Sequence, residues 1–284
     1  MAPVPCPYLP SCGRTLSWRD LAAWRDDQGP GLYLTCLEYG QQLWLDGLPA
    51  RALLAVDRAL YCDVPVDAEV LAAWVQERQA AGHSDFLPHY LQRVLTISCV
   101  FRNAQGLRVH SWVDRDGQSE GSMIQSFFHS LDKHVPQLVS WNGGGFDLPV
   151  LHYRGLQHAV VADKYWDLGE DDRDFKWNNY ISRYHHRHLD LMDLLALYQS
   201  RANAPLDAMA KLCGFPGKLG MDGSAVYEAY LNGQLEDIRR YCETDVMNTY
   251  LLYCRYQLMR GGLRAEEYRQ EMRTVRESLQ ALVD

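Results

Sequence analysis

The chain has 284 residues, 47% of them hydrophobic, and a formal net charge of −8. This composition predicts one large folded domain, or one domain with an appendage, rather than a disordered chain. The acidic balance argues against duplex binding by charge alone. It does not exclude a nuclease, since bound metal ions supply positive charge where it is needed.

The sequence carries no feature that predicts export or membrane insertion. No run approaches 18 apolar residues, and the first residues lack both a basic start and an apolar stretch. The eight cysteines include no Cys-x-x-Cys pair, which favours free thiols over a disulfide framework or a zinc site. We therefore expect a cytoplasmic protein that does not bind membranes.

The first 66 residues differ in character from the rest. Residues 1–30 are an irregular lead-in, and residues 31–65 contain two helical runs around Asp46-Gly47-Leu48-Pro49. Their small residues resemble a single tetratricopeptide-type helical hairpin. One such hairpin cannot bury its own apolar face, so we expect it to pack on the remaining chain or on a protein partner.

From residue 67 onward the pattern alternates between helices and strands, which predicts an α/β layer fold. The expected elements are a helix at 68–81 capped by Asp67, a strand at 93–101, a turn at 103–106, its hairpin partner at 107–113, a helix at 120–134, a strand at 137–141, a helix after Asp147 and mostly helix after Asp190.

The first segment that could carry chemistry runs from Ser140 to Pro149. An apolar strand leads into Asn142 and three glycines, and Asp147 then opens a helix. Glycines let the backbone approach a ligand closely, and a carboxylate is favoured at a helix N-terminus. The alternative is an ordinary strand-to-helix turn in which Asp147 is a simple N-cap.

The second segment lies about a hundred residues later. Tyr241 and Asp245 are four residues apart in a long apolar-periodic run, so they share one face of a helix. Asn248 falls on the same stripe, and an aligned set of polar side chains is typical of a cleft. The alternative is a solvated face, because this helix also carries charged residues.

Together these segments resemble a known family of nucleases. The stretch Ser-Trp-Asn-Gly-Gly-Gly-Phe-Asp at 140–147 and Tyr-Cys-Glu-Thr-Asp at 241–245 is similar to the second and third motifs of DEDDy-type 3′–5′ exonucleases. These are ribonuclease H-like enzymes related to the proofreading domain of family B DNA polymerases. The closer similarity is to the group described as predicted PolB-like 3′–5′ exonucleases, and it covers about residues 68–275.

The resemblance implies a ribonuclease H-like fold, a mixed sheet flanked by helices, over residues 67–284. It implies two-metal hydrolysis at nucleic-acid 3′ ends with Mg²⁺ or Mn²⁺. Asp147 and Asp245 would be the metal ligands, and Tyr241 would orient the attacking water. Asn142 and Phe146 would bind the terminal nucleotide. The expected substrate is single-stranded DNA, although nothing in the sequence separates DNA from RNA.

Three further polar features have open interpretations. Asp190 opens an apolar helix and is either a further substrate-binding acid or only the helix N-cap. Arg183, Arg187 and the histidines between them contact phosphates or bases, or form a solvated loop. Lys218, in a glycine-rich turn, either touches a phosphate or follows a simple helix stop.

The family's first motif, Asp-x-Glu on a central strand, has no clear counterpart. Asp57 and Asp63 lack the glutamate, and the pair Asp67 and Glu69 is better interpreted as the start of a helix. Two main hypotheses follow: an active exonuclease with ligands from an atypical N-terminal segment, or a catalytically inactive nucleic-acid-binding protein. A third is a helical interaction module with the exonuclease-like part as its scaffold.

Overall fold

The computed structural model describes residues 88–280 continuously and, before them, only residues 4–5, 15–16, 76, 80 and 82. The chain divides into two compact units, Met1–Gln92 and Arg93–Asp284. In the first unit, β1 (Val4–Pro5) pairs antiparallel with β2 (Thr15–Leu16), and η1 (His89–Leu91) is a short 3-10 helix.

The expected helical hairpin at 31–65 lies outside the described residues. The same holds for the four acidic candidates for a first motif, Asp57, Asp63, Asp67 and Glu69, and for most of the helix expected at 68–81. Predictions for these residues therefore remain predictions.

The second unit is a mixed α/β structure, as the alternating pattern predicts. Its elements are β3 (Thr96–Asn103), β4 (Gly106–Val113), α5 (Glu120–His134), β5 (Leu138–Ser140), α6 (Asp147–Gln157), α7 (Asp163–Trp166), η2 (Arg173–Lys176), β6 (His188–Asp190), α8 (Leu191–Leu195), η3 (Ser200–Ala202), α9 (Leu206–Leu212), η4 (Gly223–Ala225), α10 (Val226–Leu231), α11 (Leu235–Met259) and α12 (Ala265–Gln280). No helix of the described part is long and apolar enough to cross a membrane.

Strands β3 and β4 form the hairpin that the sequence predicts. They pair antiparallel without interruption from Thr96 opposite Val113 to Asn103 opposite Gly106. The turn closes because the Asn103 side chain accepts a hydrogen bond from the Gln105 backbone N–H at 3.0 Å. Gly106 has a φ of 140°, a conformation that L-residues rarely adopt, so a glycine is required there.

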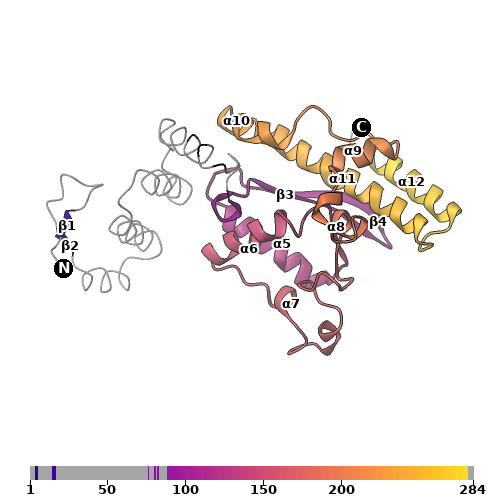
Figure 1. Cartoon of the computed structure of the whole chain (residues 1–284), viewed down its shortest axis with the longest axis horizontal. Coiled ribbons are helices and arrows are strands. Elements are labelled where there is room, and N and C mark those ends of the chain that lie inside the picture. The colour runs from indigo at the N-terminus through magenta and orange to yellow at the C-terminus, as the bar shows by residue number, and fades with distance from the viewer. Residues whose placement is uncertain are drawn as a thin grey trace. The chain divides into compact units, whose positions relative to one another are not determined.

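Helices cover both faces of the hairpin (Figure 1), with α11 and α12 on one face and α5 on the other. Side chains alternate between the faces, as the pleat of a strand dictates. Ile97 and its cross-strand partner Trp112 pack in the cluster that contains α5. Val100 and its partner Val109 pack with residues of α11 and α12.

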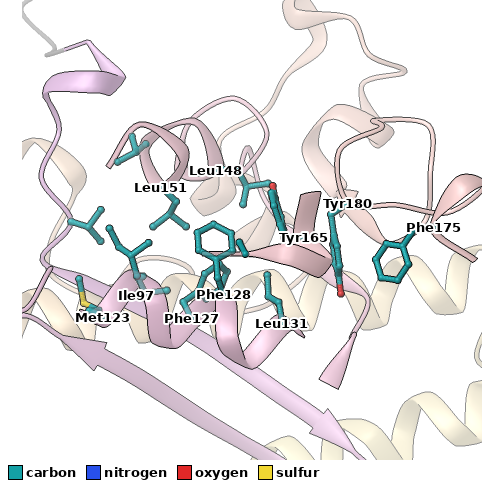
Figure 2. Close-up of a cluster of buried hydrophobic side chains, with 14 residues drawn as sticks. Ile97, Met123, Phe127, Phe128, Leu131, Leu148, Leu151, Tyr165, Phe175 and Tyr180 are labelled. Atoms are coloured by element: carbon teal, nitrogen blue, oxygen red, sulfur yellow. The ribbon is translucent and has the colours of Figure 1, made fainter. Parts of the chain in front are cut away.

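The largest apolar cluster lies between the hairpin, α5 and α6 (Figure 2). Phe128 of α5 is 2% exposed, and burying a side chain of this size contributes roughly 1.5–3 kcal/mol. The cluster continues into α7 and the chain after it, where the rings of Tyr165 and Tyr180 stack with centroids 5.4 Å apart. This core fixes α6, the helix that begins at Asp147.

A buried ion pair joins the start of β3 to α5 and α6. Glu120 accepts hydrogen bonds from the Arg154 guanidinium, from His158 at 3.0 Å and from the Val94 backbone N–H at 2.9 Å. Burial alone would raise the pKa of Glu120, but the bonds from His158 and Arg154 outweigh it and lower the pKa to about 2. The carboxylate therefore stays ionised inside the core.

A second, parallel pair of strands carries the site. Strand β5 pairs with β6 so that Ser140 lies opposite Asp190. Within residues 88–280 the strands pair in twos, β3 with β4 and β5 with β6, whereas the family resemblance implies a mixed sheet. Helix α11 packs against both β3 and β5 and so links the two sheets.

Replacing Glu120 with glutamine keeps the side-chain size but leaves the Arg154 charge buried without its carboxylate. We expect the free energy of unfolding at pH 7 to fall by about 3–5 kcal/mol, measured by urea denaturation. Because the folded-state pKa of Glu120 is lowered, its contribution is present above its ordinary pKa of 4.5 and is lost as the pH falls toward about 2. The difference between the two proteins should shrink over that range.

The matched control is Glu266→Gln, which removes an exposed carboxylate paired with Arg269. Surface pairs contribute little, so this variant should unfold like the wild type. Equal losses in Glu120→Gln and Glu266→Gln would contradict the role assigned to the buried pair.

Candidate active site

The glycine-containing loop between β5 and α6 is a tight turn that presents Asp147. Asn142 adopts a left-handed φ of 64°, and its carbonyl accepts hydrogen bonds from the N–H groups of Gly145 at 3.1 Å and Phe146 at 3.0 Å. The carbonyl of Gly143 then accepts the N–H of Leu148 at 2.8 Å. Asp147 therefore sits at the first residue of α6, where the helix dipole favours a carboxylate.

At two of the three glycines, neighbouring side chains leave no room for a Cβ atom, and the backbone φ angle is not the reason for the glycine. A Cβ on Gly143 would lie 2.5 Å from the Ser140 side chain, and one on Gly145 would lie 2.4 Å from Asn142 Oδ1. A Cβ on Gly144 would meet Asp190 Oδ2 at 3.4 Å, which is ordinary contact. Only small residues let the loop fold back on its own strand.

Asp190 holds this loop in place. Its carboxylate accepts backbone N–H groups from Asn142 at 2.9 Å and Gly144 at 2.8 Å, and it caps α8 through Met192 at 3.1 Å and Asp193 at 3.4 Å. The two oxygens thus have four backbone donors. Of the two interpretations left open by the sequence, the N-cap is confirmed, with an added contact to the loop, whereas a contact to substrate stays a prediction.

The surroundings of Asp147 disfavour the ionised form of its carboxyl group. Burial raises its pKa to about 6; its own backbone N–H opposes this, and the carboxylates of Asp190 and Asp245 add to it. Asp147 is nevertheless exposed to solvent. Many protein atoms surround its carboxylate, and they displace water from it although one side stays open. An accessible carboxylate beside two others favours a cation in its vicinity.

Asp245 and Tyr241 lie on α11, and the charge of Asp245 acts on Asp147. Burial raises the pKa of Asp245, and its Oδ1 atom is buried and receives no hydrogen bond from the described part of the chain. Burial also raises the pKa of the Tyr241 phenol, and the Asp245 carboxylate raises it further. At neutral pH the phenol is therefore protonated and can donate a hydrogen bond.

Lys218, for which the sequence left a phosphate contact or a simple helix stop open, supplies a positive charge beside Tyr241 and Asp245. Its ammonium lies 5.4 Å from the centre of the Tyr241 ring and lowers the pKa of Asp245, although burial dominates that shift. Its backbone N–H donates to Asp207 Oδ1 at 2.8 Å. The signal that could have identified Lys218 is Asn248, on the same helix stripe as Asp245.

Asn248 anchors the turn that carries Lys218. Its side chain accepts the Gly217 N–H at 3.1 Å and donates to the Gly217 carbonyl at 2.9 Å and to the Thr244 carbonyl at 2.9 Å. The residue is only 3% exposed. The prediction that Asn248 lines a cleft is therefore wrong, because a buried amide that pairs with a backbone serves to dock that segment.

The remaining predicted residues take mainly structural positions. Asn142 is half-buried in the turn, and Phe146 packs from a half-buried position against the main core cluster. Nothing in these contacts tests a role in binding a nucleotide. His188 is buried in β6, where its Nε2 lies 2.9 Å from Ser140 Oγ.

Arg183 and Arg187, for which the sequence left contact with phosphates or bases and a solvated loop open, both bind groups of the chain itself. Arg187 donates to the Asn178 carbonyl at 2.6 Å, and its guanidinium lies 4.1 Å from the centre of the Phe175 ring. Arg183 pairs with Asp193 at 2.9 Å but keeps about half of its side chain exposed. Arg187 is thus part of the framework, and Arg183 is still accessible.

Two carboxylates of this site are of the chemical type that binds divalent metals. Asp147 and Asp245 offer carboxylate oxygens, which suit Mg²⁺ or Mn²⁺, and Asp245 Oδ1 is buried without a hydrogen bond from the described part of the chain. Among residues 88–280, however, no three His, Cys, Asp or Glu side chains are grouped so as to hold a metal. Further ligands would have to come from elsewhere.

Comparison with known proteins agrees with the motifs. A family model described as a predicted 3′–5′ exonuclease related to the exonuclease domain of PolB matches residues 84–283. The matched span includes the 142–147 loop and the helix with Tyr241 and Asp245. No curated protein and no solved structure matches the chain.

The loop geometry predicts that adjacent glycines differ in tolerance. Gly143→Ala places a methyl group against Ser140 and should lower the free energy of unfolding by about 1–3 kcal/mol. Gly144→Ala, at an exposed position with ordinary contacts, should change it by less than about 0.5 kcal/mol. Urea denaturation of both variants measures this, and equal tolerance at the two positions would rule out the close approach to Ser140.

The raised pKa of Asp147 predicts a stability gain on neutralising it. The folded state binds a proton more tightly than the unfolded state, so stability falls as the pH rises from the ordinary value of 3.8 through about 6. Without metal, Asp147→Asn should unfold at a higher temperature than the wild type at pH 8. The gain should stay under about 1 kcal/mol, since water screens an exposed carboxylate.

At pH 4 the wild-type side chain is itself largely protonated, so the two proteins should then unfold together. Melting curves in a metal chelator at pH 4, 6 and 8 check the trend. A variant that is less stable than the wild type at pH 8 would contradict the claim that the ionised Asp147 carboxylate destabilises the fold.

Proposed function

Because the chain belongs to the family of predicted 3′–5′ exonucleases related to the exonuclease domain of PolB, we propose that it removes nucleotides from nucleic-acid 3′ ends. The observation that carries the proposal is the buried Asp245 Oδ1 on α11, which receives no hydrogen bond from residues 88–280, together with Asp147 at the first residue of α6 in the other matched motif. The fold that accompanies this chemistry is ribonuclease H-like, and the preferred substrate is the 3′ end of single-stranded DNA.

In this proposal Asp147 and Asp245 hold the divalent cations, magnesium or manganese. When bound, these ions activate water and stabilise the departing 3′ oxygen. The orphaned Oδ1 of Asp245 and the raised pKa of Asp147 support the assignment, because a cation would relieve both. The enzyme hypothesis needs at least one further carboxylate, and the sequence candidates for it are Asp57, Asp63, Asp67 and Glu69.

Tyr241 and Lys218 act at the scissile phosphate. The protonated phenol donates a hydrogen bond to the attacking water and so orients it. The Lys218 ammonium, held beside Tyr241 by the turn that Asn248 anchors, offsets the charge of the phosphate. Asn142 and Phe146 contact the terminal nucleotide from the loop.

A catalytically inactive nucleic-acid-binding protein is the second candidate. One observation favours it: residues 88–280 lack a three-ligand metal group. Two carboxylates alone bind two divalent ions weakly, so without further acids the inherited surface would bind nucleic acid without cutting it.

Cleavage of a 5′-labelled single strand with Mg²⁺ or Mn²⁺ separates the two candidates. We expect stepwise shortening from the 3′ end that falls more than about 100-fold in the Asp147→Asn, Asp245→Asn double variant. Tyr241→Phe should lose at least about tenfold in kcat, because the water is no longer oriented.

Asp237→Asn is the matched control, since it removes an exposed carboxylate two turns earlier on the same helix. It should cleave like the wild type. A folded wild-type protein that binds the strand but never shortens it would overturn the exonuclease proposal in favour of the inactive candidate.

A further inference from the structure

A second surface feature lies in the segment between η2 and β6. This surface segment, residues 175–187, joins the core at two buried rings: Phe175 and Tyr180 are each 1% exposed. Both rings belong to the main cluster (Figure 2), and the Tyr180 hydroxyl donates to the Pro136 carbonyl at 2.7 Å. The segment is thus seated on the core although it has no regular secondary structure after Lys176.

Two asparagines fix its conformation from within. Asn179 Oδ1 accepts the N–H groups of Ile181 at 3.2 Å and Ser182 at 2.9 Å, and Asn179 Nδ2 donates to the Phe175 carbonyl at 3.1 Å. Asn178 Oδ1 accepts the His186 N–H at 3.0 Å. So many internal bonds make the segment a formed surface, and ordering it on binding would cost little.

This fixed segment nevertheless leaves two large aromatic side chains in water. Trp177 is 77% exposed and Tyr184 is 73% exposed. Lys176 Nζ lies 5.4 Å from the centre of the Trp177 ring. A single exposed aromatic is common, but two on one ordered segment, one of them beside a cation, are a typical recognition surface.

Tyr184 packs against a strained turn formed by Leu197 and Tyr198. Leu197 and Tyr198 have left-handed φ values of 52° and 60°, which are uncommon for residues other than glycine. The turn seats Tyr198 under Arg183, whose guanidinium lies 4.7 Å from the ring centre, and Tyr184 packs edge-on against the same ring at 5.5 Å. Strain of this kind persists where surrounding contacts hold a surface in shape.

Charge identifies the kind of partner. Residues 175–187 include Lys176, Arg183 and Arg187 and no acidic residue, in a chain with a net charge of −8. Acidic side chains crowd the preceding residues, 163–174, which would repel a polyanion there. The complement of exposed aromatics with cations is a single-stranded nucleic acid, whose bases stack and whose phosphates are charged.

The surface segment is also tied to the candidate active site. It runs directly into β6, whose last residue, Asp190, holds the 142–144 loop. Arg183 pairs with Asp193 in α8, the short helix that Asp190 caps. One short helix therefore connects the exposed aromatics to the loop that presents Asp147.

We propose that residues 175–187 form the surface that binds the single strand upstream of the cleaved end, with bases stacked on Trp177 and Tyr184. Lys176 and Arg183 contact the phosphates of that strand. This inference rests on the proposed function and names the segment that binds the substrate strand.

The test is the affinity for a 5′-fluorescent oligodeoxythymidine and an oligouridine, measured by anisotropy in a metal chelator so that no cleavage occurs. Trp177→Ala and Tyr184→Ala should each weaken binding by roughly fivefold or more for at least one of the two strands, the loss of one stacked base. Trp177→Phe and Tyr184→Phe keep a ring and should restore most of the affinity. Lys176→Ala should reduce the dependence of binding on salt.

Tyr227→Ala is the matched control, because Tyr227 is an aromatic residue that is 55% exposed on α10. It should bind like the wild type. Unchanged affinity for both strands in Trp177→Ala and Tyr184→Ala, with their unfolding transitions intact, would overturn the inference and point to a protein partner for these side chains.

The Asp147→Asn, Asp245→Asn double variant separates this inference from the proposed function. It should lose cleavage and keep binding. A wild-type protein that never cleaves, yet loses binding in Trp177→Ala, would remove the exonuclease proposal and leave the binding surface standing.

Discussion

The candidate site depends on one set of hydrogen bonds, those that the Asp190 carboxylate accepts from Asn142 and Gly144. Parallel pairing of β5 with β6 sets Ser140 opposite Asp190, so the carboxylate reaches the loop that follows β5. The loop in turn fixes the start of α6 and with it Asp147. An ionised acid that accepts several backbone N–H groups is a strong and directional anchor. Without it, the glycines would leave the loop free to move.

The same anchor adds to the unfavourable electrostatics of the candidate site. Asp190 adds negative charge beside Asp147, and Asp245 adds more from α11. Lys218 offsets part of this charge at Asp245, and the buried Oδ1 of that residue still has no donor within residues 88–280. These carboxylates therefore lower the stability of the fold, as residues of functional sites commonly do. Elsewhere, as at Glu120, a buried carboxylate is fully paired and stabilises the fold.

Much of the architecture could be predicted from the sequence because it is local. The helix at 120–134, the hairpin with its turn at 103–106 and the helix start at Asp147 follow from periodicity and from turn residues whose effects act within a few positions. The pairing of strands could not be predicted in the same way, since hydrogen bonds between distant strands depend on the whole chain. The described strands pair in twos, where the family resemblance implied a mixed sheet.

The sequence by itself determined which groups are available: Asp147 at a helix start, Tyr241 and Asp245 on one helical face, and a family whose members are expected to cut 3′ ends. Only the tertiary structure decided how they are used. It turned Asn248 from a predicted cleft residue into the buried anchor of Lys218, and it assigned Arg187 to a stack on Phe175. Side chains far apart in sequence acquire charge partners and burial only when the chain folds, and burial and charge set a pKa.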